Sequence, residues 1–217
     1  MVTLTLTFFN KKVNMGFGLT KEHLDFYHEN HFIEFEDLLS SKEVDQIEMG
    51  IDSVIPKESH GKEWIKAGHD VWRHDEQVKK IILRKNLAET ASSLSKKRPL
   101  RIAYDQVIEG PLSKEPHNLI EVSSIRKVVC GLALQLESAS TIEHPLVPKK
   151  RGSGIFFYPF QELNFPENCH LLMIAYTEEI ALYIHEKRDP NVHALKKLGY
   201  GYGDRLLSTT HPILYRS

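Results

Sequence analysis

The side chains in this chain that are best suited to chemistry are its twelve histidines and the acidic residues beside some of them. Two early His-x-acid patterns occur, His23-Leu24-Asp25 and His74-Asp75-Glu76. On a helix of about 3.6 residues per turn, the side chains of His23 and Asp25 point about 200° apart, so they cannot hold one metal ion. Ordinary surface polarity accounts for both patterns. No serine or cysteine stands in a nucleophile motif, and no phosphate-binding glycine pattern occurs.

Other histidines lie close to aromatic residues or in polar turns. His60, His69 and His74 share residues 57–75 with Trp64 and Trp72. These tryptophans either cover a pocket that excludes water from a reactive site or pack a long loop. His185 and His193 flank the sequence EKRDP and are interpreted as part of a solvated turn.

Composition excludes several classes of function. The 217 residues carry 28 basic and 29 acidic side chains, a formal net charge of −1, which provides no general attraction to nucleic acid or to an anionic membrane. No apolar run reaches the length of a membrane-spanning helix, and residues 1–9 alternate like a strand and do not resemble a secretory signal. Cys130 and Cys169 are expected to be buried thiols, which favours a cytoplasmic protein.

Residues 1–99 predict a mainly helical lead-in to a single domain that spans residues 1–217. Thr20 is suited to cap a helix that runs to about residue 30, and residues 31–35 predict a short strand. Ser40 and Glu43 form a capping box before a helix that Pro56 ends. Residues 57–75 have no clean period and predict a long loop, and the apolar positions of 78–94 predict one long amphipathic helix.

From residue 100 onward the hydrophobic period changes to two, which is typical of strands. The predicted strands span residues 100–108, 128–137, 155–158, 171–176, 181–184 and 205–215. Several short strands after a helical lead-in indicate an α+β chain with helices packed on a sandwich or small barrel.

Several phrases together resemble the phytanoyl-CoA-dioxygenase-type branch of the iron(II)/2-oxoglutarate oxygenases over residues 19–217. They are LTKEHLDFYHENHFIEFEDLLSSKEV, LRIAYDQVI, CGLALQLES, GSGIFFYP and GYGDRLLSTTHPILYRS, in the family's order. The chain also resembles uncharacterised chlamydial proteins related to that branch. The resemblance implies a double-stranded β-helix, or jelly roll, with iron(II) and 2-oxoglutarate as cofactors. Such an iron centre uses two imidazoles and one carboxylate on one face of the metal.

The resemblance implies metal ligands at positions that are only partly filled by suitable residues. His117 stands at the position of the first ligand, but the residue two positions later is Leu119, which cannot bind a metal. If the segment is extended, Glu121 shares a strand face with His117, so a shifted pair of His117 and Glu121 is one alternative. His211 follows Gly203-Asp204 and is the candidate for the distal ligand. In another register of HPILYR the ligand position holds Arg216, and the distal imidazole is then missing.

For the cosubstrate, the resemblance implies that strand residues such as Tyr104 and Gln106 line the pocket. A plain core position for Tyr104 is the alternative. Arg205 or Arg216 is the candidate for binding the 2-oxoglutarate carboxylate, because a guanidinium fits a carboxylate with two hydrogen bonds.

These features lead to three hypotheses about function. The first is an iron(II)/2-oxoglutarate oxygenase-like protein with a degenerate metal site that hydroxylates a small molecule. The second is an inactive relative that binds a small molecule or a protein, and the missing carboxylate at Leu119 favours it. The third is a metal-responsive regulator that binds nucleic acid, but the chain has neither the basic face nor the reading helix that such a regulator needs.

Overall fold

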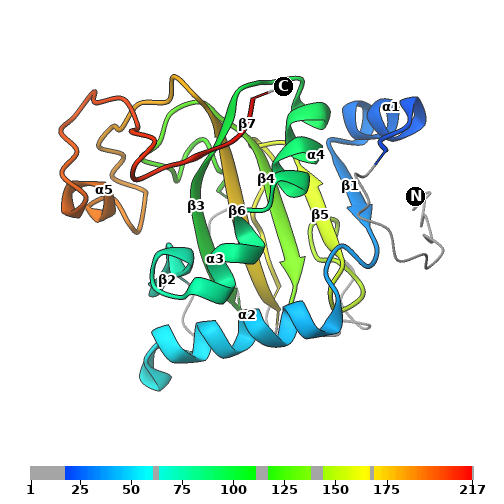
Figure 1. The fold of residues 1–217 in the computed structure, drawn as a ribbon, viewed down its shortest axis with the longest axis horizontal. Coiled ribbons are helices and arrows are strands. Elements are labelled where there is room, and N and C mark those ends of the chain that lie inside the picture. The colour runs from blue at the N-terminus through cyan, green and yellow to red at the C-terminus, as the bar shows by residue number, and fades with distance from the viewer. Residues whose placement is uncertain (1–17, 61–63, 111–116, 138–143, 167–168, 217) are drawn as a thin grey trace.

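A computed structural model describes residues 18–60, 64–110, 117–137, 144–166 and 169–216. The expected strand over residues 1–9 lies outside this part of the chain. Within it, seven strands form one antiparallel sheet, and most helices lie over one face of that sheet (Figure 1). The described residues therefore form an α+β fold with one extended sheet at its centre.

The helical elements precede most of the strands. The helices are α1 (Lys21–Asn30), α2 (Ser41–Val54), α3 (Glu76–Ile82), α4 (Lys85–Ser95) and the short α5 (Ala194–Lys197), with two short 3-10 helices, η1 (Lys57–Ser59) and η2 (Val71–Arg73). Thr20 and Ser40 each form the N-terminal capping box of the helix that follows, α1 and α2 respectively. The two capped helices begin where the sequence predicts.

The strands are β1 (Phe32–Phe35), β2 (Trp64–His69), β3 (Leu100–Glu109), β4 (Val128–Gln135), β5 (Gly154–Phe157), β6 (His170–Glu178) and β7 (Ile213–Tyr215). Their order is β1-β5-β4-β6-β3-β2, and β7 also pairs with β3. A register shift interrupts the β3–β6 ladder between Ile102 and Tyr104. The predicted strands at 100–108, 128–137, 155–158 and 171–176 are confirmed with small changes of their ends.

Other predictions about the elements were wrong. Residues 57–75 contain strand β2, which adds to the edge of the sheet beside β3, and so they are not one long loop. The helix predicted over 78–94 is broken into α3 and α4, because Arg84 has an extended backbone. Residues 181–184 and most of 205–215 form no ladder, and there the structure has only isolated bridges, Ile125 with Tyr183 and Leu182 with Arg205.

Two apolar cores lie on the two faces of the sheet. In the first core, the four helices α1, α2, α3 and α4 pack against strand residues such as Ile102, Val107 and Leu132. The second core joins the other face, through residues such as Tyr104 and Ala133, to irregular segments that include Leu119, Leu163 and Tyr183. Burial of apolar surface on both faces explains why the central strands are almost continuously buried.

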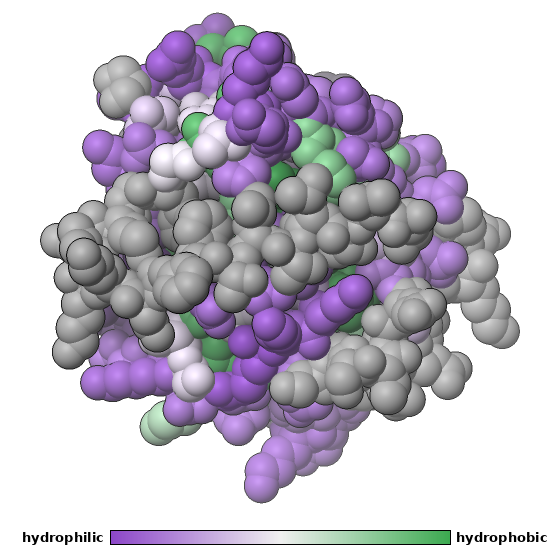
Figure 2. Space-filling model, turned by 90° about the vertical axis from the view of Figure 1, so that its right-hand side faces the viewer, coloured by the Kyte–Doolittle hydropathy of each residue, from purple (hydrophilic) through white to green (hydrophobic). Residues whose placement is uncertain are grey.

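One side of the molecule has a mainly hydrophilic described surface. Figure 2 shows the side near α1 and β1, where hydrophilic residues dominate the described surface and hydrophobic residues are scattered. No helix in the described part of the chain has both the length and the apolar character needed to cross a membrane. Cys130 and Cys169 are both buried, free thiols, as expected.

Candidate functional site

Strand β3 presents the polar residues at the centre of the candidate site. After the register shift near Ala103, Tyr104 belongs to the second core, whereas Val107 belongs to the first. Side chains alternate along a strand, so Gln106 lies on the same side as Tyr104, and Asp105 lies on the opposite side with Val107. The prediction that places Tyr104 and Gln106 on this strand is confirmed.

The polar groups of Tyr104 and Gln106 serve the fold. The Gln106 amide donates to the backbone carbonyls of Ile65 (3.0 Å) and Val107 (2.9 Å) and accepts from Asn191 Nδ2 (3.0 Å). Tyr104 is buried and packs against His69, with ring centroids 5.2 Å apart, and burial raises the pKa of its phenol. The Gln106 amide therefore has its hydrogen-bonding groups engaged within the protein.

His117, the candidate first metal ligand, is half-buried beside an apolar region. Its backbone carbonyl accepts a hydrogen bond from the Leu163 backbone N–H at 2.6 Å. Leu119 and Leu163 are both buried in the second core. Glu121 is partly exposed, and its carboxylate lies 3.8 Å from the Arg188 guanidinium. Leu119, the residue two positions after His117, is thus part of the apolar core and offers no donor to a metal.

His211, the candidate distal ligand, has both ring nitrogens engaged. Nε2 lies 3.1 Å from an Arg73 guanidinium nitrogen, and Nδ1 lies 3.0 Å from the Tyr200 hydroxyl. Burial, together with the positive charge of Arg73, lowers the pKa of His211 to about 3. An imidazole held between a guanidinium and a phenol offers no free nitrogen to a divalent cation.

Neither of the two arginines predicted to bind the 2-oxoglutarate carboxylate is buried. Arg205 is exposed, and Arg216 is exposed with its guanidinium 3.5 Å from the Glu179 carboxylate. Across the described residues, no group of three histidine, cysteine, aspartate or glutamate side chains is arranged to hold a metal ion. His117, Glu121 and His211 are therefore not brought together as a ligand set, and the described residues do not supply the predicted iron site.

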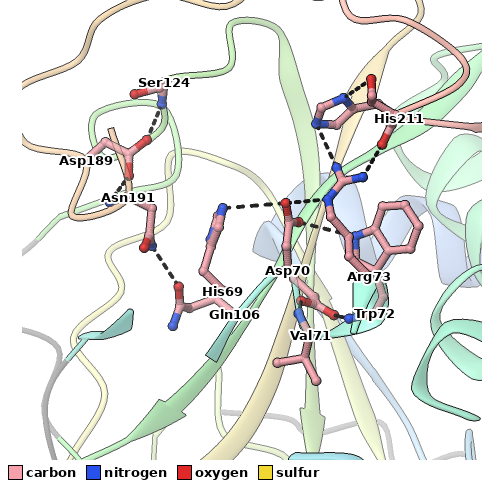
Figure 3. A network of polar contacts seen from close by, with 12 residues as sticks. His69, Asp70, Val71, Trp72, Arg73, Gln106, Ser124, Asp189, Asn191 and His211 are labelled. Carbon is pink, nitrogen blue, oxygen red and sulfur yellow. Dashed lines mark hydrogen bonds and ion pairs between the residues drawn. The ribbon is translucent and has the colours of Figure 1, made fainter. Parts of the chain in front are cut away.

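A network of buried charges occupies the region where β2, η2 and β3 meet (Figure 3). The fully buried carboxylate of Asp105 accepts hydrogen bonds from the backbone N–H groups of Val71 (2.7 Å) and Trp72 (3.0 Å). Asp70, at φ 56°, accepts from the Trp72 indole (3.2 Å) and from Arg73 Nε (2.7 Å). Burial, and then the nearby charge of Asp70, raises the pKa of Asp105. The network fixes the turn after β2 and aims Arg73 at His211.

A pocket of about 670 Å³ lies between this turn and the segment around α5. Its lining includes six basic side chains, Lys66, His69, Arg73, His74, His193 and Lys197. We refer to it as the basic pocket. His69 and His74 come from the segment in which the sequence suggested a pocket, but residue 193 was assigned to a solvated turn. The sequence gives no signal that would bring residues 66–74 next to residues 190–198.

Known proteins resemble this chain in their structures and not in their sequences. No family model matches the chain, and no curated protein matches it. The structure is similar to that of SnoK, a non-heme α-ketoglutarate-dependent carbocyclase from nogalamycin biosynthesis, with a TM-score of 0.72, 15% identity, and coverage of 93% of this chain and 99% of SnoK.

Two further structures have the same fold. SnoN, an epimerase in complex with Fe³⁺, α-ketoglutarate and nogalamycin RO, gives a TM-score of 0.62 and 15% identity over 88% of this chain and 96% of SnoN. CT296 from Chlamydia trachomatis gives 0.52 and 16% over 76% of this chain and 99% of CT296. The chain therefore has the fold of non-heme 2-oxoglutarate-dependent enzymes, and its chlamydial resemblance is confirmed.

Proposed function

We propose that this chain is a non-catalytic relative of the iron(II)/2-oxoglutarate oxygenases that uses their jelly-roll type of fold to bind a small molecule. The observation that carries this proposal is the engagement of His211 with Arg73 and Tyr200, at 3.1 Å and 3.0 Å. Leu119, buried where the resemblance implies a carboxylate, supports the same conclusion. Because the described residues bring no set of metal donors together, we look for the function of this fold in its pocket.

The basic pocket is the site that we assign to this binding. Its volume of about 670 Å³ falls within the range of about 300 to 1,000 Å³ that small-molecule sites occupy. It lies at the edge of the sheet, against residues of β2 and of the 190–198 segment. None of the predicted metal ligands, His117, Glu121 and His211, is among the residues that line it.

Anaerobic titration with iron(II) and 2-oxoglutarate tests the first part of this proposal. An oxygenase of this type develops a visible metal-to-ligand charge-transfer band when both bind, and SnoN is a suitable positive control because its structure contains iron and α-ketoglutarate. We expect this chain to develop no such band and to retain no iron after gel filtration. One iron per chain together with the band would contradict the proposal and favour an active oxygenase that hydroxylates a small molecule.

A further inference from the structure

The charges that line the basic pocket are not balanced within it. Asp70 is the only carboxylate residue among its lining residues, and its oxygens already accept from Arg73 and Trp72. Lys66 and Lys197 also line it, and neither forms an ion pair with any residue of the described ranges. Within the described residues, two exposed ammonium groups therefore border the pocket without an ion-pair partner, which favours an anion there.

His69 places a largely buried imidazole in the wall of the pocket. Its side chain is only 10% exposed, and its Nε2 lies 3.9 Å from the Asp70 carboxylate. Nδ1 has no hydrogen-bond partner among the described residues, but it is buried, so a molecule in the pocket does not reach it. The attraction for an anion therefore comes from the other basic side chains of the lining.

The remaining lining gives the ligand an apolar part. Val54, Ala67, Pro190, Ala194 and Leu198 contribute apolar surface to the same pocket. A fully hydrated inorganic ion would leave this surface against water. An organic molecule with one anionic end suits both the apolar and the basic parts of the lining. Its apolar body covers the apolar side chains, and its charge lies near the lysines.

We infer that the basic pocket binds a small organic anion, a carboxylate or phosphate ester attached to an apolar body. Lys66 and Lys197, which line the pocket and are exposed to solvent, attract the anionic group. This inference rests on the proposed small-molecule-binding function and specifies the chemistry of its ligand.

Isothermal titration calorimetry of the full chain without metal tests the ligand class. The probes are hexanoate and hexyl phosphate, with 1-hexanol as the neutral analogue, hexylammonium as the charge-reversed analogue and inorganic phosphate as the anion without an apolar body. We expect one site per chain for either or both organic anions, at least tenfold weaker binding of the other three, and weakening with added salt. Comparison of hexanoate with hexyl phosphate shows which anionic group is preferred.

Two adjacent lysines provide a matched pair of variants. Both side chains are exposed, but Lys197 lines the pocket and Lys196 does not. Lys197→Gln should weaken binding of the organic anion by about tenfold, the effect of losing one charge-assisted contact of about 1.4 kcal/mol. Lys196→Gln should leave affinity within about twofold, and equal thermal melting of both variants excludes a folding defect.

Distinct results would overturn the inference and the proposed function separately. Absence of binding by both organic anions, or equal binding of hexanol or hexylammonium, would overturn the anionic ligand class. Equal losses in the Lys196 and Lys197 variants would overturn the pocket as the site. The charge-transfer band in the titration with iron(II) and 2-oxoglutarate tests only whether the chain is non-catalytic. The pocket experiments are done without metal, so their outcome does not depend on that band.

Discussion

At the scale of single residues, His211 is a side chain whose protonation is linked to folding. Its pKa lies at about 3 in the folded protein, below the ordinary value of 6.5. Below pH 6.5 the unfolded chain therefore binds a proton that the folded chain excludes, so stability is lost as the pH falls from 6.5 toward 3. The slope is about 1.4 kcal/mol per pH unit in this window.

We predict that the free energy of unfolding falls by about 2 kcal/mol through His211 alone between pH 7 and pH 5. Urea unfolding at both pH values measures this. His211→Gln should reduce the pH dependence by that amount, because glutamine does not titrate. His185→Gln, which removes an exposed imidazole, should retain the wild-type slope. A His211→Gln protein with the same slope as the wild type would contradict the placement of this ring.

Leu119 provides a second test at the residue scale, because it stands where the resemblance implies a metal-binding carboxylate. Leu119→Asp would place a charge in the apolar second core, where this side chain is fully buried. We expect the free energy of unfolding to fall by at least about 3 kcal/mol. Iron(II) titration should still show no binding, because His211 remains engaged with Arg73.

The control for this experiment is Leu119→Met, which keeps the volume and should cost less than about 1.5 kcal/mol. A stable Leu119→Asp protein that gains stoichiometric iron would mean that the region around His117 is a metal site lacking one ligand. That result would overturn the non-catalytic proposal.

At the scale of elements, the sequence predicted those helices and strands whose position depends on interactions between residues close together in the chain. The capping boxes at Thr20 and Ser40 fix the starts of α1 and α2, and alternation in residues 100–108 predicted β3. Strand β2 lies at the edge of the sheet and was missed because its irregular pairing with β3 stabilises it, and a sequence window does not contain that partner. The break at Arg84 was missed for a similar reason, since its guanidinium binds Glu43 of another helix.

The candidate site was predictable to a smaller extent. Tyr104 and Gln106 were placed on the correct strand, but their contacts with His69 and Asn191 come from segments far away in sequence. The lining of the basic pocket is drawn from residues between 54 and 198, so no motif of short spacing represents it. Sequence spacing predicts a site well only where one element or one turn supplies most of its residues.

The capping box of α2 leads to a prediction at the element scale. Ser40 Oγ accepts from the Glu43 backbone N–H at 3.3 Å, and the Glu43 carboxylate accepts from the Ser40 backbone N–H at 2.8 Å. Ser40→Ala removes the first of these bonds and should lower the free energy of unfolding by about 1 kcal/mol. Ser41→Ala, one residue into the helix, should change it by less than about 0.5 kcal/mol. Urea unfolding of both proteins measures the difference, and equal effects would argue against this cap.

At the scale of the whole molecule, residues 206–215 connect elements that are far apart in the sequence. In Figure 1 this red segment runs from the side of α5 across the sheet to β7, which lies beside β3 and α4. Arg73 holds the segment through the backbone carbonyl of Thr210 and the ring of His211. Arg101, which is 3% exposed, donates to the backbone carbonyls of Leu206 (2.9 Å) and His211 (3.0 Å).

Arg101 therefore joins the central strand β3 to both ends of the segment 206–211. Arg101→Met keeps a long side chain but leaves the carbonyls of Leu206 and His211 without this donor. The resulting loss of stability is partly offset, because the variant has no guanidinium that must be desolvated on folding. We expect a net loss of about 2 to 4 kcal/mol in the free energy of unfolding.

The same substitution should loosen the C-terminal segment before the rest of the molecule. Hydrogen exchange followed by mass spectrometry should show faster exchange in peptides covering residues 206–215 of the Arg101→Met protein, and unchanged protection in β4 and β6. Arg205→Met, which removes an exposed guanidinium nearby in sequence, is the matched control and should leave both regions unchanged. Identical exchange of residues 206–215 in the two variants would mean that Arg101 does not hold this segment, and Arg73 would then be the contact that closes the fold.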